Sequence, residues 1–174
     1  MQTTKKQTIF FAQPYDISAT GFYFSSVEGF LKQSARVRDA FSLPVEEYEI
    51  QFIDGDELDA ALFKAIGVHQ GGIGAFLGAC DNLNPDQKQK IIIAVGECGC
   101  SFDLKTGDPD KLDVDLYEMD SLRELAEHFV DEGLFGEIPE SVKNHLDYDS
   151  IARDLSVDYT ETVIGGTSLI YRCG

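Results

Sequence analysis

The acidic side chains of this 174-residue chain are concentrated in its last third. Residues 1–100 hold 13 Asp and Glu against 8 Lys and Arg, a net charge of −5, whereas residues 101–174 hold 18 against 6, a net charge of −12. Acids that only kept a chain soluble could be scattered evenly. Clustered acids create a local negative field that repels nucleic acid and attracts basic protein surfaces. The charge pattern therefore predicts a partner with a basic groove, as DNA-binding proteins have.

The spacing of apolar residues predicts an α+β fold. Residues 46–53 alternate between apolar and polar positions, which is typical of a half-buried strand. Residues 56–67 and 121–133 each begin with a capping residue, continue with apolar residues at helical spacing and end at glycine, which is typical of helices. Residues 159–172 contain two β-prone runs joined by a Gly-Gly turn, the clearest hairpin signal in the chain. Most acids fall on the polar faces of these elements, where water solvates them.

Three small modules in a row are the expected organisation. Breaks in the pattern at residues 54–56 and 106–109 divide the chain into an N-terminal α+β module (1–55), a mainly helical module (56–108) and an acidic C-terminal α+β module (109–174). The C-terminal module combines a strand, helices and the β-hairpin.

Local capping signals set the expected helix starts. Ser25, with Glu28 three residues later, predicts a helix over residues 26–40. Asn84-Pro85-Asp86 predicts a helix over residues 85–97, although the β-branched Ile91-Ile92-Ile93 favours a strand. Asp149 is expected to cap a helix near the C-terminus.

Motifs for cofactor or metal chemistry are incomplete. The glycine-rich residues 72–78 follow a predicted helix and lack the Gly-Lys-Ser/Thr of a phosphate loop, so we expect them to pack helices tightly. An EF-hand counted from Asp108 would place Asp113 and Met119 where Gly and Glu are needed. Cys98-Gly99-Cys100 has no second half of a zinc site. We therefore expect no metal, no cofactor and no catalytic residues.

The spacing of the acids resembles a row of phosphates. Same-face strand positions lie about 6.6 Å apart, helix positions three or four apart are separated by about 5–6 Å, and the through-space separation of phosphates along one DNA strand is similar. Predicted members of the row are Asp113 and Asp115 on a strand, Glu124, Glu127 and Asp131 on a helix, and then Glu137, Glu140, Asp147, Asp149, Asp154 and Asp158.

Three alternatives remain open from the residues alone. The acids can be an ordinary solvated face, although that alternative predicts an even charge distribution rather than −5 against −12. The chain can also be a soluble enzyme or a small-molecule-binding protein with an unrecognised site, or an acidic inhibitor of another basic DNA-binding protein. A deep apolar pocket with perturbed carboxylates would favour the enzyme.

The N-terminal residues and the hydropathy predict a cytoplasmic protein. No apolar run approaches the length of a membrane span. The short apolar run at residues 9–12 is followed at once by Pro14, Tyr15 and Asp16, which does not fit a signal peptide.

The C-terminal region resembles the ArdA-type antirestriction proteins. The similar features are the run LRELAEHFVDEGLFGEIPE at residues 122–140, the run HLDYDSIARDL at residues 145–155, and the closing hairpin. Residues 114–118 are similar to the strand that precedes the family's helix, and residues 46–50 resemble its N-terminal domain more loosely. The similarity covers roughly residues 112–172.

The resemblance implies a non-enzymatic mimic of B-form DNA. Proteins of this family are carried by mobile elements, form elongated three-domain α+β chains that dimerise, and occupy the DNA groove of type I restriction-modification enzymes, chiefly on the specificity and modification subunits. They need no cofactor and do not bind nucleic acid directly. In this chain the acids that would replace phosphates are Asp108, Asp110, Asp113, Asp115, Glu118, Asp120, Glu124, Glu127, Asp131, Glu132, Glu137, Glu140, Asp147, Asp149, Asp154 and Asp158.

Overall fold

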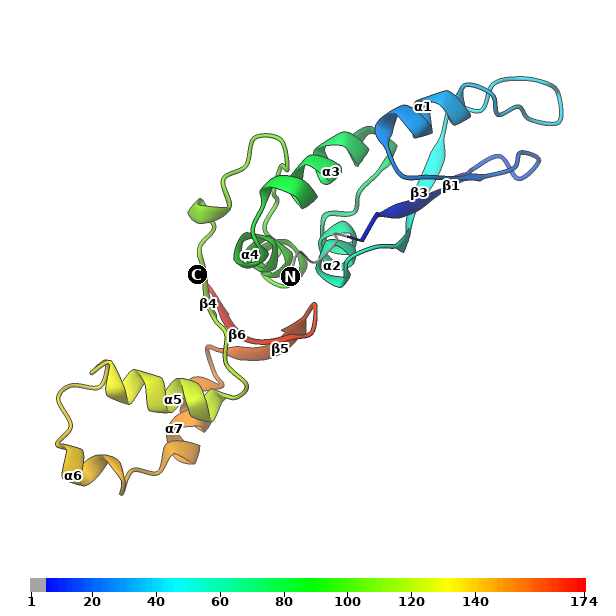
Figure 1. The fold of residues 1–174 in the computed structure, drawn as a ribbon. Helices are drawn as coiled ribbons and strands as arrows, with labels where there is room; N and C mark the ends of the chain where they lie inside the picture. The colour runs from blue at the N-terminus through cyan, green and yellow to red at the C-terminus, as the bar shows by residue number, and fades with distance from the viewer. Residues whose placement is uncertain (1–5) are drawn as a thin grey trace. The chain divides into compact units, whose positions relative to one another are not determined.

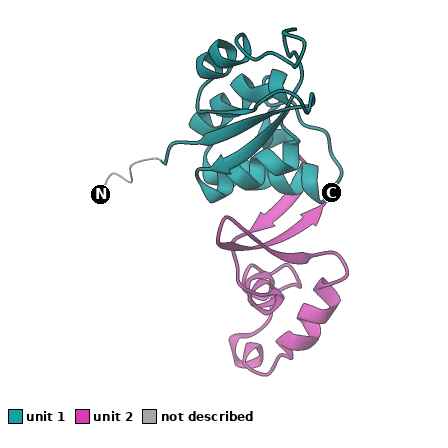
Figure 2. Cartoon of the chain, turned by 90° about the vertical axis from the view of Figure 1, so that its right-hand side faces the viewer, with its two compact units in different colours: residues 1–111 teal, residues 112–174 magenta. Residues whose placement is uncertain are grey.

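The computed structural model describes residues 6–174 and confirms the α+β fold class. The described part contains seven α-helices, two short 3-10 helices and two three-stranded antiparallel sheets (Figure 1). The chain divides into two compact units, unit 1 at residues 1–111 and unit 2 at residues 112–174 (Figure 2). The finer division of unit 1 near residue 55 stays a prediction.

Unit 1 contains a sheet with the strand order β2-β1-β3 and four α-helices. The strands are β1 (Ile9–Pro14), β2 (Phe22–Phe24) and β3 (Tyr48–Asp54). Tyr48 and Ile50 are buried while Glu49 and Gln51 are exposed, so the predicted alternation of β3 is confirmed. The helices are α1 (Val27–Ser34), α2 (Glu57–Ile66), α3 (Ile73–Asn82) and α4 (Pro85–Gly96), with 3-10 turns at Gln70–Gly72 and Pro109–Lys111.

An aromatic cluster forms the core of unit 1. The fully buried ring of Phe10 on β1 lies with its centroid 5.2 Å from Phe24, 5.8 Å from Phe52, 5.9 Å from Phe63 and 6.0 Å from Phe76. These distances are typical of favourable offset and edge-to-face aromatic packing. Residues of the sheet and of helices α2 and α3 therefore share one core.

A buried ion pair links three helices of unit 1. The Lys88 Nζ atom on α4 lies 2.6 Å from Asp59 Oδ1 on α2 and donates a second hydrogen bond, 3.0 Å long, to the carbonyl oxygen of Cys80 on α3. The two charged side chains are 9% and 1% exposed. A buried charge without a partner is costly, so this pair constrains how the three helices pack.

Unit 2 contains the second sheet, with the order β4-β6-β5, and three helices. The strands are β4 (Val114–Tyr117), β5 (Thr160–Ile164) and β6 (Thr167–Cys173), and the helices are α5 (Leu122–Asp131), α6 (Glu140–Lys143) and α7 (Tyr148–Leu155). The hairpin of β5 and β6 is confirmed, with both turn glycines at positive φ. A core cluster of unit 2 consists of Leu125, Phe129, Tyr159 and Ile170. Tyr117, Met119, Leu122 and Leu155 pack against this cluster.

Several helix boundaries differ from the predictions. Helix α1 is capped by Ser26 rather than Ser25, because the Ser26 hydroxyl accepts from the Gly29 amide. It ends at Ser34 rather than at residue 40, and the next segment turns where Asp39 Oδ1 accepts from the amides of Phe41 and Leu43. Helix α7 is capped by Asp147, so the predicted cap at Asp149 is wrong.

The remaining local predictions have mixed outcomes. Helix α4 is confirmed, with a complete capping box between Asn84 and Gln87, and burial of Ile91, Ile92 and Ile93 explains its β-branched run. The prediction that residues 72–78 pack helices tightly is wrong. A side chain at Gly74 would meet only Val27, at 3.5 Å, and one at Gly78 would meet nothing within 4 Å. Most of this segment belongs to α3 itself.

Candidate partner-binding surface

The negative charge is far denser in unit 2 than in unit 1. Residues 112–174 hold 15 acidic and 4 basic side chains, a net charge of −11, whereas the 111 residues of unit 1 hold 16 and 10, a net charge of −6. Fourteen of the sixteen predicted acids lie in unit 2, while Asp108 and Asp110 lie at the end of unit 1.

None of the sixteen predicted acids is buried. Asp115 and Glu127 are half-buried and the other fourteen are exposed, which leaves all sixteen accessible within the chain. The predicted acids of unit 2 lie on or next to several elements: β4 and the turn after it, α5, the α5–α6 connection, α6, and α7 with the turn after it. Unit 2 therefore presents carboxylates from strands, helices and turns alike.

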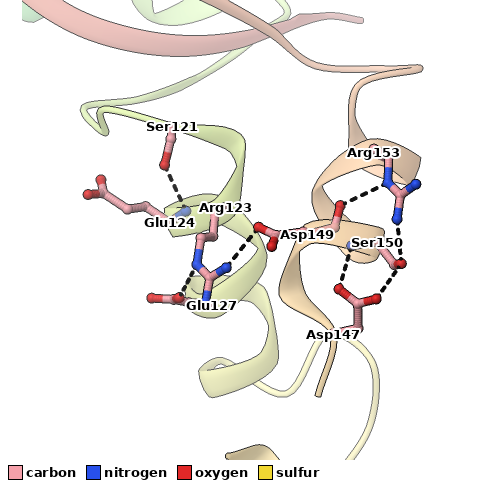
Figure 3. A network of polar contacts seen from close by, with 8 residues as sticks. All are labelled: Ser121, Arg123, Glu124, Glu127, Asp147, Asp149, Ser150 and Arg153. Atoms are coloured by element: carbon pink, nitrogen blue, oxygen red, sulfur yellow. Dashed lines mark hydrogen bonds and ion pairs between the residues drawn. The ribbon is translucent and has the colours of Figure 1, made fainter. Parts of the chain in front are cut away.

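Arg123 joins the acids of two helices that are distant in sequence (Figure 3). Its Nη1 atom donates to Asp149 Oδ1 on α7 at 2.8 Å, and its Nε atom donates to Glu127 Oε1 on its own helix α5 at 3.2 Å. The bond to Asp149 is the main cause that raises the pKa of the guanidinium, because it stabilises the charged form. Glu127 and Asp149 are therefore held by one cation.

Two further cations of unit 2 pair with acids of a different element. Lys143 on α6 lies 3.0 Å from Asp131 Oδ1 on α5 and 3.2 Å from Glu140 Oε2, and its pKa is raised chiefly by the bond to Asp131. The Nε atom of Arg172 on β6 donates to Asp115 Oδ2 on β4 at 2.9 Å. The Arg172 guanidinium also lies 5.2 Å from the centre of the Tyr159 ring, within cation–π range.

Hydrogen bonds hold two more carboxylates without a cation. Asp147 caps α7 by accepting from the Ser150 amide at 3.0 Å and from the Ser150 hydroxyl at 2.8 Å, and the hydroxyl is the largest cause that lowers the pKa of Asp147. Glu124 accepts from the Asp120 amide at 2.9 Å while Ser121 caps the same helix. Both carboxylates are exposed yet held at a defined position, and Figure 3 shows the two bonds of Asp147 to Ser150.

The predicted row is thus of two kinds. We call Asp115, Glu127, Asp131, Glu140 and Asp149 the paired acids, because each lies within 4.0 Å of an Arg or Lys nitrogen of unit 2. Within residues 6–174 no such ion pair forms at a second group, the unpaired acids of unit 2: Asp113, Glu118, Asp120, Glu124, Glu132, Glu137, Asp147, Asp154 and Asp158.

Sequence reasoning missed one acid and the three cations that pair with the predicted acids. Glu161 on β5 is exposed and accepts from the Leu122 amide at the start of α5, at 2.7 Å. The spacing of Arg123 and Glu127 by four residues is a recognisable helix pair. The contact of Arg123 with Asp149 spans 26 residues and that of Arg172 with Asp115 spans 57, so no local pattern indicates either one.

Among residues 6–174 no group of three or more His, Cys, Asp or Glu side chains could hold a metal ion. A cavity of about 520 Å³ lies between α5 and α6, lined by three acids, two glycines, Val130, Ile138, Pro139 and Lys143. The ammonium group of Lys143 already contacts Asp131 and Glu140. None of the helices in the described part is both long and apolar enough to cross a membrane.

The described acids define unit 2 as a strongly acidic protein surface whose carboxylates are exposed and in part fixed. The sequence model of the antirestriction protein family ArdA matches residues 80–168, which is slightly more than half of the chain. The chain therefore belongs to the ArdA antirestriction family. The match contains the whole of α5, α6 and α7 and all sixteen predicted acids. A search of curated proteins finds no match to this chain.

Proposed function

We propose that this chain is a mimic of B-form DNA that occupies the DNA-binding groove of type I restriction-modification enzymes. The partners would be the specificity and modification subunits, and the benefit would be protection of incoming mobile DNA. The observation that carries the proposal is the net charge of −11 in unit 2 of a chain that belongs to the ArdA family. None of the sixteen predicted acids is buried.

Fixed carboxylates explain how such a protein would compete with DNA. The paired acids, Asp147 and Glu124 are held by bonds inside unit 2, so less conformational freedom is lost when a partner binds them. The unpaired acids are exposed and form no ion pair within residues 6–174. Such rim charges mainly accelerate association and make it sensitive to salt.

The proposal includes a homodimer that acts in the cytoplasm without catalysis or a cofactor. Unit 2 exposes three apolar side chains near α6: Leu134 is 64% exposed, Phe135 52% and Val142 44%. Exposed apolar groups of this size are candidates for burial at an interface. This trio is the surface on which to test dimerisation, by sedimentation of a variant with Phe135→Asp; an unchanged dimer would place the interface elsewhere.

Distributed charge predicts that no single carboxylate is essential. Glu137 is exposed on the α5–α6 connection and forms no ion pair within residues 6–174. We expect Glu137→Gln to weaken inhibition about twofold to threefold, since one rim charge contributes little beyond steering. A folded Glu137→Gln protein without any inhibition would contradict distributed mimicry.

A competition experiment tests the proposed function. The purified chain would be titrated into a type I methyltransferase bound to fluorescent target DNA, at two salt concentrations. We expect release of the DNA at a near-stoichiometric amount of protein and a weaker effect at the higher salt concentration. A folded protein that displaces no DNA would refute the mimic and would leave another basic partner as the explanation of the charge.

A further inference from the structure

Arg123 is a positive charge placed inside the most acidic surface of the molecule. Its side chain is 51% exposed, bonds to Glu127 and Asp149 on two different helices, and lies 6.0 Å from the centre of the Tyr148 ring. A protein selected only for negative charge would gain from losing this cation. Its contacts instead fix the separation of two carboxylates that belong to α5 and α7 (Figure 3).

Arg153 provides an internal comparison on the same surface. It lies on α7, is exposed, and donates to the Asp149 carbonyl oxygen at 3.4 Å and to the Ser150 hydroxyl at 2.8 Å. Both bonds stay within its own helix, so they do not fix α7 relative to α5. The two arginines carry the same charge and differ in what they connect.

We propose that Arg123 is a positioning residue for inhibition, which holds Glu127 and Asp149 at the separation that the basic partner requires. This inference rests on the function proposed above. It predicts that removal of the Arg123 charge weakens binding to the basic partner, although the chain becomes more negative. If charge alone determined binding, the same change would strengthen it.

The two accounts also differ in the rate constant that changes. A change in overall charge acts mainly on the association rate through steering. Loss of a fixed carboxylate geometry acts on the bound state, since the partner must then order the side chains itself. The positioning account therefore predicts faster dissociation for Arg123→Gln, while the charge account predicts faster association for any lost cation.

The experiment compares Arg123→Gln with Arg153→Gln in the full chain, since both have a formal net charge of −18 in place of −17. Binding to a type I methyltransferase would be followed by surface-immobilised kinetics, with thermal melting as the control for folding. We expect Arg123→Gln to dissociate about fivefold faster than the unmodified chain and Arg153→Gln to dissociate at its rate. Arg123→Lys, which can contact one carboxylate but lacks the planar fork, should recover part of the loss.

The outcomes separate this inference from the function on which it rests. Equal dissociation rates for Arg123→Gln and Arg153→Gln, with an unmodified chain that binds, would overturn the positioning role alone. Unchanged melting with faster dissociation only for Arg123→Gln would support it. An unmodified chain that does not bind the methyltransferase would refute the proposed function, and the inference with it.

Discussion

The two units of this chain treat charged side chains in different ways. Unit 1 buries Asp59 and Lys88 against each other and has a separate cluster of packed phenylalanine rings. Unit 2 exposes most of its acids, and Arg123 and Lys143 each join two carboxylates from different elements, while Arg172 pairs with Asp115 across two strands. In unit 1 a charge pair contributes to packing. In unit 2 the cations fix the positions of carboxylates that are exposed or half-buried.

The largest expected effect is on the buried pair of unit 1. Asp59→Ala would leave the Lys88 ammonium group buried with the Cys80 carbonyl oxygen as its one remaining partner within residues 6–174. We expect the free energy of unfolding to fall by about 3–5 kcal/mol, as measured by chemical denaturation. The double variant Asp59→Leu with Lys88→Met should recover most of the loss, because it removes both charges.

The matched change in unit 2 sharpens this contrast. Asp115→Ala removes the carboxylate from an exposed pair with Arg172, whose guanidinium remains accessible to water. We expect a much smaller loss of stability than for Asp59→Ala, since exposed pairs contribute little. Similar losses for the two variants would show that the units do not differ in this respect.

Added salt should stabilise unit 2 more than unit 1. Its carboxylates repel one another, and the Debye length falls from about 30 Å at 0.01 M to about 3 Å at 1 M ionic strength. We expect the melting temperature, measured by scanning calorimetry, to rise with salt and any separate transition of unit 2 to rise further. A melting temperature that does not change with salt would show that the acids are not close enough to repel.

The smallest expected effect concerns the pH dependence of the α7 cap. Because the folded-state pKa of Asp147 is lowered, its stabilising contribution is present above the unfolded-state pKa of about 3.9 and is lost as the pH falls through the folded-state pKa. Asp147→Asn keeps a capping side chain that does not titrate. The melting-temperature difference between the two proteins should therefore shrink between about pH 5 and pH 2. A constant difference would contradict this assignment.

Local sequence patterns predicted most elements but few of the contacts that organise the surface. Asp56, Asn84 and Ser121 mark helix starts correctly because capping depends on residues only two or three positions away. The end of α1 was predicted too late, since the turn made by Asp39 competes with helix continuation. Such competition between nearby signals limits the precision of predicted boundaries.

The candidate surface shows the same division between local and distant information. The acids and their exposure follow from composition and periodicity. The pairing of the acids does not follow from the sequence, because the contacts of Arg123 with Asp149 and of Arg172 with Asp115 depend on how the helices and strands pack. The sequence thus predicts the charge of the surface, and the tertiary structure determines which carboxylates are fixed.

One measurement tests whether unit 2 rather than total charge carries inhibition. Two variants of the full chain would each carry four substitutions of exposed acids by the corresponding amides, Glu→Gln or Asp→Asn, and would have a formal net charge of −13. The unit 1 variant would change Glu46, Glu47, Glu49 and Glu97, and the unit 2 variant would change Glu118, Glu132, Glu137 and Asp158. Both would be titrated against a type I methyltransferase bound to target DNA. We expect the unit 1 variant to displace DNA nearly as well as the unmodified chain, and the unit 2 variant to be weaker by about tenfold or more. Equal displacement by the two variants would contradict the account.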